Sequence, residues 1–577
     1  MQAIYNIAEI CARHGITDVI LSPGSRSAPL TLAFARHPAL TVRVVPDERA
    51  AAFIGLGIAQ AQRRAVALVC TSGTAGLNYA PAVAEAFFQQ IPLVIFTADR
   101  PPEWIDQLDG QTIRQRNLYG AHAKGAFEFP VDTTPADAKW HSARIVNEAI
   151  NLAQAAPAGP VQVNVPLREP FYPKAGEQIG YEQDVKIIHE QAFHAALSPT
   201  DILELRQLLR QAGRVVVVAG QQPSSPELLA ALHGFAKAGK VLVVGDVITN
   251  VSEISAVHRQ DVFLAGLSEA DKDALKPDLL ITFGLSLISK SLKLFLRGAA
   301  PAHHWHLQAA GEAADTFRSL TRVVRVAPAA FFQQFSGLKT TEDAGSERLI
   351  FPLATKPVTW RQADAAAAAF LEQFFASDFQ RFNEFSAFRH ALALLPEHSA
   401  LHLANSMAVR YANILGIPQG NHIEVFANRG TSGIDGCTST AVGAALAQPN
   451  RPVVLLTGDV AFFYDRNAFW HNYPLPNLRV VLFNNHGGGI FRIIDGPRQQ
   501  PELDEFFETR QALTAENTAR DFHLRYFPVS TFAELETALP VFFAAETGAA
   551  ILEVFTDSKT NAAFFEQYRA AVKKTFS

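Results

Sequence analysis

Short apolar, β-branched runs alternate with longer amphipathic segments along almost the whole chain of 577 residues. In the N-terminal third the runs lie at 17–25, 42–46, 65–73, 92–99 and 159–173, the last with a Pro-rich end, and segments such as 48–64 between them have a helical pattern. Runs that are apolar on both faces, with helices between them, are typical of parallel strands covered on both sides. This pattern predicts an α/β fold of doubly wound parallel sheets.

The same alternation occurs in three blocks of comparable size, which fits roughly 100–200 residues per domain. The expected strands of the second and third blocks are 214–220, 240–246, 278–284, 304–308, 400–406, 422–428, 452–459, 478–485 and 549–555. A polar stretch at 337–347 is expected to link these two blocks. We therefore expect three domains, at 1–180, 195–345 and 360–577.

The composition excludes several classes of protein. Hydrophobic residues make up 48% and charged residues 18%, which indicates a filled core rather than disorder. The net charge is -5, so the chain has no overall attraction for nucleic acid, and any anionic ligand needs a local cluster of cations. We expect no membrane insertion, because no apolar run is long enough. Three scattered cysteines favour a reducing cytoplasm.

The sharpest motifs lie in the third block, where polar residues follow two successive apolar runs. Gly458-Asp459 ends one run, and NNHGG at 484–488 ends the next. Because the carboxyl ends of parallel strands meet at one edge of a sheet, Asp459 and Asn485 are expected to be neighbours. A carboxylate, an amide oxygen and a backbone carbonyl near Gly487 suit Mg²⁺ bound to diphosphate. Either motif alone is more often an ordinary turn; together they favour such a site.

This pair of motifs resembles the signature of the thiamine diphosphate (ThDP)-dependent enzymes, in which GD is followed at a set distance by NN. The resemblance implies three doubly wound parallel-sheet domains. In chain order they are a pyrimidine-binding domain, a central domain and a diphosphate-binding domain. It implies ThDP and Mg²⁺ (or Mn²⁺) as cofactors, with Asp459, Asn485 and Gly487 as metal ligands and Gly458 beside the diphosphate. It also implies a homodimer or a dimer of dimers, because the family's cofactor lies between two subunits.

The resemblance further implies a catalytic glutamate in the first domain, and Glu48 matches it within PDERAAAF at 46–53. In the family this carboxylate bonds N1′ of the aminopyrimidine and favours the imino tautomer, whose N4′ removes the thiazolium C2 proton. Read from the residues alone, Asp47-Glu48 is more often an acidic pair at a helix N-terminus, where the helix dipole favours negative charge, and it is the paired diphosphate motif that favours the catalytic role.

Five further blocks resemble the menaquinone-biosynthesis branch of this family. They are SPGSRSAPLTLA (22–33), TSGTAGLNYAPAV (71–83), TADRPPEWID (97–106), GQTIRQ (110–115) and NRGTSGIDG (428–436). The resemblance implies decarboxylation of 2-oxoglutarate and conjugate addition of the succinyl-ThDP enamine to isochorismate. The alternative is another ThDP-dependent 2-oxo acid decarboxylase or carboligase, similar to acetohydroxyacid synthase. A non-catalytic relative is disfavoured, because Glu48, Asp459 and Asn485 are all retained.

Both substrates are dicarboxylates, so the site must hold four carboxylates with cations and hydroxyls. The resemblance assigns the binding of these carboxylates to Ser25, Arg26, Arg100, Gln111, Lys290, Arg410 and Arg429. It assigns a hydrophobic wall beside the reacting centre to Ile490 and Phe491. It places Ser406 and Ser432 near the diphosphate arm and Ile434 beneath the bent cofactor. The chain departs from the family pattern at Ser291, where a second basic residue is common, and at Ala461, where this branch often has Ser. Lys293, one helical turn from Lys290, could compensate for Ser291.

Overall fold

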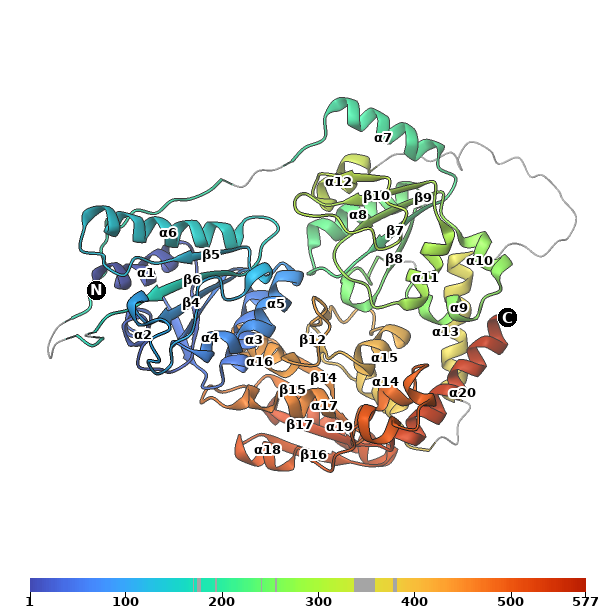
Figure 1. Ribbon diagram of the computed structural model, residues 1–577. Helices are drawn as coiled ribbons and strands as arrows, with labels where there is room; N and C mark the ends of the chain where they lie inside the picture. The colour runs from blue at the N-terminus through green and yellow to red at the C-terminus, as the bar shows by residue number, and fades with distance from the viewer. Residues whose placement is uncertain are drawn as a thin grey trace, which may run out of the picture.

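Three parallel sheets form the described part of the chain, which is a computed structural model (Figure 1). The described residues are 1–169, 171–173, 178–191, 195–239, 241–254, 257–336, 359–376 and 381–577. Every pairing of the named strands is parallel, which confirms the α/β prediction. The linker expected at 337–347 lies outside the described residues. None of the described helices is long and apolar enough to cross a membrane.

The first sheet has the order β2-β1-β3-β4-β6-β5. Its strands are β1 (Asp18–Leu21), β2 (Thr41–Val44), β3 (Val66–Cys70), β4 (Leu93–Asp99), β5 (Gly125–Glu128) and β6 (Val161–Pro166). Val19 and Leu21 share a core with α1 (Gln2–Arg13) and α6 (Ala136–Gln154), whereas Ile20 packs with α3 (Glu48–Gln62) and α5 (Ala80–Gln89) on the other side. Successive strand residues point to opposite faces, so both faces are covered.

The central sheet has the order β11-β10-β9-β7-β8. Its strands are β7 (Val215–Ala219), β8 (Leu242–Gly245), β9 (Leu279–Phe283), β10 (His303–Leu307) and β11 (Arg322–Val324). His304 and His306 each lie 2.9 Å from Oγ1 of Thr282. Burial lowers the pKa of His304 to about 4, so it is neutral near pH 7 and belongs to the packed interior.

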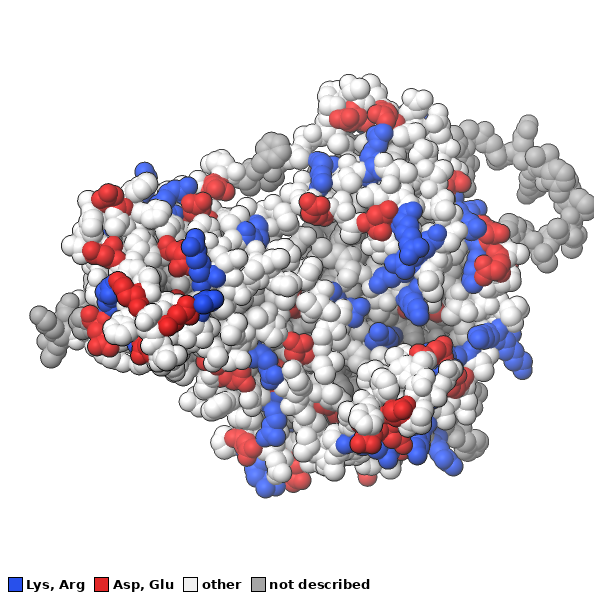
Figure 2. Space-filling view, in the orientation of Figure 1, with Lys and Arg blue, Asp and Glu red and all other residues white. Residues whose placement is uncertain are grey.

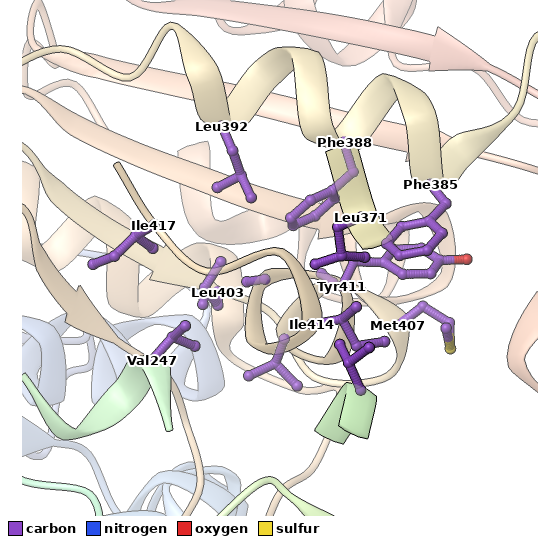
Figure 3. Packing of buried hydrophobic residues seen from close by; sticks show 14 of the residues in the cluster. Val247, Leu371, Phe385, Phe388, Leu392, Leu403, Met407, Tyr411, Ile414 and Ile417 are labelled. Atoms are coloured by element: carbon purple, nitrogen blue, oxygen red, sulfur yellow. The ribbon is translucent and has the colours of Figure 1, made fainter. Parts of the chain in front are cut away.

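The third sheet has the order β13-β12-β14-β15-β17-β16. Its strands are β12 (Ala400–Leu403), β13 (Glu424–Phe426), β14 (Val453–Gly458), β15 (Leu478–Asn484), β16 (Arg525–Val529) and β17 (Ala550–Phe555). On the face of the molecule in Figure 2, acidic and basic side chains are interspersed, as expected from the small net charge. Phe388 and Tyr411 pack α14 (Glu384–Ala393) on α15 (Met407–Leu415), and Val247 of the central domain joins this cluster (Figure 3).

Three strands were not predicted from the sequence, namely β5, β11 and β16, and each lies at one edge of its sheet. Their burial alternates or is partial, as in β5, whose four residues alternate between half-buried and exposed. An edge strand has a neighbour on one side only, so its sequence lacks the continuous apolar run on which the prediction depended.

The first and third domains pack through two glycines. A Cβ at Gly57 of α3 would lie 2.0 Å from the carbonyl oxygen of Thr440 in α16 (Cys437–Ala447). A Cβ at Gly443 of α16 would lie 2.1 Å from the carbonyl oxygen of Ile54. The two backbones therefore touch, and only glycine fits at these positions.

Candidate active site

The carboxyl edge of the third sheet brings together residues from four strand ends. From β12 the chain adds β13 on one side of the sheet, and it then crosses over to add β14 and β15 on the other side. The direction in which strands are added therefore reverses between β12 and β14. Open α/β sheets bind ligands at such a point, beyond the carboxyl ends of the strands. Asp459 directly follows β14, and Asn485 directly follows β15. The two strands pair, with Gly458 opposite Phe483. The structure thus confirms that Asp459 and Asn485 end neighbouring strands.

Asp459 is buried and held by three donors. Its Oδ2 accepts hydrogen bonds from the backbone N–H of Gly487 at 2.7 Å and from Nε2 of Gln511 at 2.9 Å, and its Oδ1 accepts one from the N–H of Val460 at 2.8 Å. Burial raises the pKa of Asp459 to about 6, although these donors oppose the shift. A cation beside this carboxylate would remove most of that desolvation cost. Gln511 was not predicted, because it lies in a loop without a recognisable motif.

Asn485 presents an unused oxygen beside this carboxylate. Its Nδ2 donates to Glu384 at 2.8 Å, while its buried Oδ1 has no hydrogen-bond partner among the residues that the structure describes. Burial raises the pKa of Glu384 to about 7, with Asp459 adding to the shift. Glu384 orients the amide and was missed, because a Glu at the start of a helix is common for capping reasons alone.

These groups fit a hard divalent cation. They supply a carboxylate, a buried amide oxygen without a partner, and the carbonyl of Gly487, whose N–H already bonds Asp459. In the part of the chain that the structure describes, no three His, Cys, Asp or Glu side chains gather into a metal cluster. A metal at this edge would therefore depend on amide and carbonyl oxygens as well as on Asp459.

The loops after β12 and β13 are held together above the same edge. Asn405 Nδ2 donates to the carbonyl of Gly433 at 2.6 Å, which keeps Ser432 and Ile434 close to Ser406. Ser406 and Ser432 have φ angles of 71° and 63°, in the region that favours glycine. Such strained backbone is concentrated at functional sites. Ile434 is partly exposed, so it is not an ordinary core residue.

Glu48 faces a cavity in the first domain. Asp47 caps α3 by accepting hydrogen bonds from the N–H groups of Arg49 at 2.9 Å and Ala50 at 3.2 Å. Glu48 is not used for that purpose, and it lines a cavity of about 320 Å³ together with the segments 71–75 and 109–113. All of its lining residues belong to the first domain, so among the described residues none of the third domain lines this cavity.

Ser25 and Arg26 lie in the turn after β1, next to this cavity. The preceding residue, Gly24, packs closely on Thr71, which lines the cavity: a Cβ on Gly24 would lie 2.2 Å from Cβ of Thr71. Ser25 is exposed, but Arg26 is buried, donates to the carbonyl of Leu167 at 3.0 Å and stacks on the ring of Phe171, 4.4 Å from its centroid. The guanidinium is thus held in place beside the cavity by first-domain contacts.

Arg100 and Gln111 lie on one loop of the same domain. Arg100 donates to the carbonyl of Gly110 at 2.8 Å and pairs with Asp109 at 3.3 Å. Gln111 is exposed, has a φ of 55° and lines the cavity with Glu48. Gln111 therefore lines the Glu48 cavity, and Arg100 pairs with Asp109, which also lines it.

The other predicted cations lie where the central and third domains meet. Arg429 donates to Oδ1 of Asn405 at 2.9 Å. The pKa of Arg410 is lowered by desolvation and then by the charge of Arg429, so the two guanidinium groups are within electrostatic reach of each other. Arg410 also bonds the carbonyl of Ser406. Lys290 is exposed at the first residue of α11 (Lys290–Ala299).

Ile490 and Phe491 lie in the short helix at Gly489–Arg492, just beyond the loop after β15. Both are partly buried, and the Phe491 ring lies 5.8 Å from that of Phe507. They form an apolar surface a few residues from Asn485, which is consistent with the predicted hydrophobic wall.

Three family models match the chain in sequence order. The N-terminal TPP-binding domain of thiamine pyrophosphate enzymes matches residues 1–119, the middle domain of thiamine pyrophosphate enzymes matches 182–403, and the C-terminal TPP-binding domain matches 411–554. The first match covers β1 to β4 of the first sheet, the second covers the whole central sheet and reaches β12, and the third covers β13 to β16 and most of β17. The three-domain ThDP-enzyme architecture is thereby confirmed.

Curated relatives match the chain over nearly its whole length. A 2-succinyl-5-enolpyruvyl-6-hydroxy-3-cyclohexene-1-carboxylate synthase from Cytophaga hutchinsonii is 44% identical over 100% of both chains. The synthase of the same name from Porphyromonas gingivalis is 39% identical over 96% of this chain and 94% of its own. Benzoylformate decarboxylase from Polynucleobacter necessarius superposes with a TM-score of 0.70 over 97% of this chain and 99% of its own, at 16% identity, and so shares the fold.

Proposed function

The chain belongs to the 2-succinyl-5-enolpyruvyl-6-hydroxy-3-cyclohexene-1-carboxylate synthases among the thiamine pyrophosphate enzymes, and from this premise we propose that it decarboxylates 2-oxoglutarate and adds the succinyl unit to isochorismate. The observation that carries the proposal is the identity of 44% over the full length of a synthase of that name. The site geometry supports it, because the Glu48 cavity and the Asp459–Asn485 edge are both formed.

We propose the following roles for the residues. Asp459, Asn485 and Gly487 hold Mg²⁺ or Mn²⁺ and, through it, the diphosphate of the cofactor next to Gly458. Ser406 and Ser432 bond the same arm, and Ile434 supports the cofactor from below. Bound ThDP supplies the electron sink that decarboxylation of a 2-oxo acid requires. This assignment is supported by the unpartnered Oδ1 of Asn485 and the buried Asp459.

In this proposal Glu48 would hold the pyrimidine end of the cofactor, where a carboxylate in a sheltered cavity can hold or release a proton. Arg26, Arg100 and Gln111 bind substrate carboxylates on the first-domain side, together with Ser25. Arg410, Arg429 and Lys290 do so on the other side, and Ile490 and Phe491 exclude water from the reacting carbon. The support is that Gln111 lines the Glu48 cavity, that Arg410 and Arg429 lie within electrostatic reach of each other, and that Ile490 and Phe491 follow the loop after β15.

We further propose a homodimer, or a dimer of dimers, in which each site combines the first domain of one subunit with the third domain of another. Its support is that first-domain residues alone line the Glu48 cavity. Co-expressed Glu48→Gln and Asp459→Ala chains test this, since each mixed dimer then has one intact site. Random pairing should restore about a quarter of the wild-type sites. Recovery no greater than the sum of the two separate variants would contradict the shared site.

We also propose that the protein works in the cytoplasm. All three cysteines are free and buried, with none in a disulfide, as is usual in a reducing compartment. Fractionation of the native host with an antibody to the chain would check this.

The decisive assay for the activity mixes the protein with ThDP, Mg²⁺ and 2-oxoglutarate, with and without isochorismate. We expect CO₂ release that depends on isochorismate, together with the adduct. The alternative, a different ThDP-dependent decarboxylase or carboligase, would release CO₂ without isochorismate or would prefer another 2-oxo acid. Glu48→Gln should bind ThDP normally and turn over slower by about 100-fold or more; unchanged turnover would refute its role.

A further inference from the structure

A buried carboxylate of the first domain is bonded to the loop that follows β13 in the third domain. Glu85 is 1% exposed and lies on α5, at the side of the first domain that is toward the other two domains (Figure 1). Its Oε1 accepts a hydrogen bond from the N–H of Gly430 at 2.7 Å. Its Oε2 accepts two from Thr431, one from the N–H at 2.7 Å and one from Oγ1 at 2.6 Å. The carboxylate therefore binds this loop across the domain boundary.

The burial of Glu85 depends on the third domain. Among the described residues, three of the four groups that donate to this carboxylate belong to Gly430 and Thr431, and the fourth is Nε2 of Gln89 on α5. An ionised carboxylate can only accept hydrogen bonds, and burying one without donors is costly. The loop also lies directly on α5, because a Cβ at Gly430 would be 2.7 Å from the backbone oxygen of Glu85.

The central domain holds the same loop slightly earlier in the chain. Gln221, which follows β7, donates through Nε2 to the carbonyl of Ala427 at 2.8 Å and to Oε1 of Gln89 at 3.2 Å. Ser286 Oγ donates to the carbonyl of Arg429 at 3.0 Å. Both neighbouring domains thus fix the loop, the central domain at 427 and 429 and the first domain at 430–431.

The residues on either side of the Glu85 contact are two of those assigned to the site. Arg429 immediately precedes the contact, and its guanidinium donates to Oδ1 of Asn405 at 2.9 Å. Ser432 immediately follows the contact and has a φ of 63°. A residue other than glycine keeps such a backbone only where its surroundings fix it. The hydrogen bonds to Glu85 lie between these two residues, so they fix the backbone from which both side chains project.

We propose that Glu85 is a positioning residue of the active site, which fixes the loop 429–432 so that the Arg429 side chain is directed at a substrate carboxylate. This inference rests on the proposed function, and it adds a first-domain residue of the same chain to what determines substrate binding. Glu85 acts through Arg429 and does not touch the substrate. In Glu85→Gln an amide N–H replaces one acceptor oxygen, so it faces another N–H or O–H donor and the loop must move.

The test is a double-variant cycle on Glu85 and Arg429. We compare Glu85→Gln, Arg429→Ala and the double variant, and we measure KM for both substrates, kcat, ThDP affinity and urea unfolding on the holoenzyme. Glu424→Gln is the matched control, because Glu424 also joins the three domains but begins β13, at the opposite end from the loop. It pairs with Arg63 of the first domain at 3.0 Å and accepts a hydrogen bond from the N–H of Ser224 of the central domain at 3.2 Å.

Glu85→Gln and Arg429→Ala should raise KM for the same substrate, each by about tenfold or more, because hydrogen bonds to charged groups are the strong ones. The double variant should stay within about threefold of the larger single effect, because Glu85 acts through a side chain that is already absent. Glu424→Gln should lower the free energy of unfolding without raising that KM by more than about threefold. Unchanged KM in Glu85→Gln, effects that multiply in the double variant, or an equal rise in Glu424→Gln would overturn the inference.

Thr431→Val keeps the inference testable if Glu85→Gln does not fold. It removes only the hydroxyl that donates to the same carboxylate and leaves both backbone N–H groups in place. This variant should raise the same KM by about threefold, in the direction of the larger change. A wild-type KM in Thr431→Val would count against the contact.

Failure of the proposed function has a different result, because wild-type protein would then show no isochorismate-dependent release of CO₂. Backbone hydrogen exchange, measured by mass spectrometry on the peptide that covers 427–434, still decides the role of Glu85, since it does not depend on turnover. Exchange at Gly430 and Thr431 that is about tenfold or more faster in Glu85→Gln than in wild type and Glu424→Gln supports the positioning role. Equal exchange in all three proteins refutes it.

Discussion

Gly57→Ala adds one methyl group where α3 of the first domain crosses α16 of the third, and so tests how these domains pack. The new Cβ would lie 2.0 Å from the carbonyl oxygen of Thr440, 2.9 Å from its carbonyl carbon and 3.0 Å from its Cα. All three are backbone atoms, so no side chain can rotate away. Cβ contacts under 3.0 Å are essentially never seen, so the helices must separate by about 1 Å or more.

Overpacking of a tight interior costs about 1–3 kcal/mol. Replacing a helical glycine by alanine offsets part of this, by about 0.5–1 kcal/mol, through the unfolded state. We therefore expect Gly57→Ala to lower the free energy of unfolding by about 1–2 kcal/mol. Glu48 begins α3, so the same displacement moves its carboxylate. A misplacement of about 1 Å can cost about 100-fold in rate, and we expect kcat/KM to fall more than stability does.

The assay is urea unfolding followed by circular dichroism, with kcat/KM measured on the same preparations. Gly298→Ala in α11 is the matched control, because nothing lies within 4 Å of its new Cβ. It should be neutral or stabilising by up to about 1 kcal/mol. Gly443→Ala introduces a similar overlap at the same helix crossing, from α16. The double variant should therefore lose less unfolding free energy than the sum of the losses in the two single variants. Wild-type stability and activity in Gly57→Ala would refute the backbone contact.

Three further predictions follow from buried groups. Burial raises the pKa of Asp465 to about 7, so its contribution to stability is fully present below about pH 4 and is lost between about pH 4 and pH 7, by about 4 kcal/mol in total; Asp465→Asn should flatten the fall in unfolding free energy between about pH 4 and pH 7, and an unchanged slope would contradict this. Asp459→Ala should abolish Mg²⁺-dependent binding of ThDP in calorimetry, whereas undiminished binding would remove Asp459 from the metal site. Burial raises the pKa of the thiols of Cys11, Cys70 and Cys437, so native protein should resist iodoacetamide under conditions that label the unfolded chain, and rapid native labelling would show that these thiols are accessible.

The interior strands could be predicted because burial on both faces imposes a continuous apolar run on the sequence. β4, for example, is buried at all seven positions, from Leu93 to Asp99. The edge strands β5, β11 and β16 have no such constraint, so their local pattern does not differ enough from that of a loop.

Part of the candidate site could be predicted in the same way. Asp459 and Asn485 each follow a strand that the pattern shows, and parallel pairing then makes them neighbours. Glu384 and Gln511 could not be found, because their sequence neighbourhoods are those of an ordinary helix start and a loop. Only their hydrogen bonds to Asn485 and Asp459 show what they do.

By itself, the sequence determined the order of three α/β units, the strand ends that carry the polar motifs, and the lack of an overall field for anions, because each of these is local or compositional. The tertiary structure decided which surfaces meet. It placed Gly57 against Thr440, tied Asn413 to Asp261, and joined Ser286 to Arg429. Such contacts join residues more than a hundred positions apart, and periodicity within one helix or strand contains no information about its distant partner.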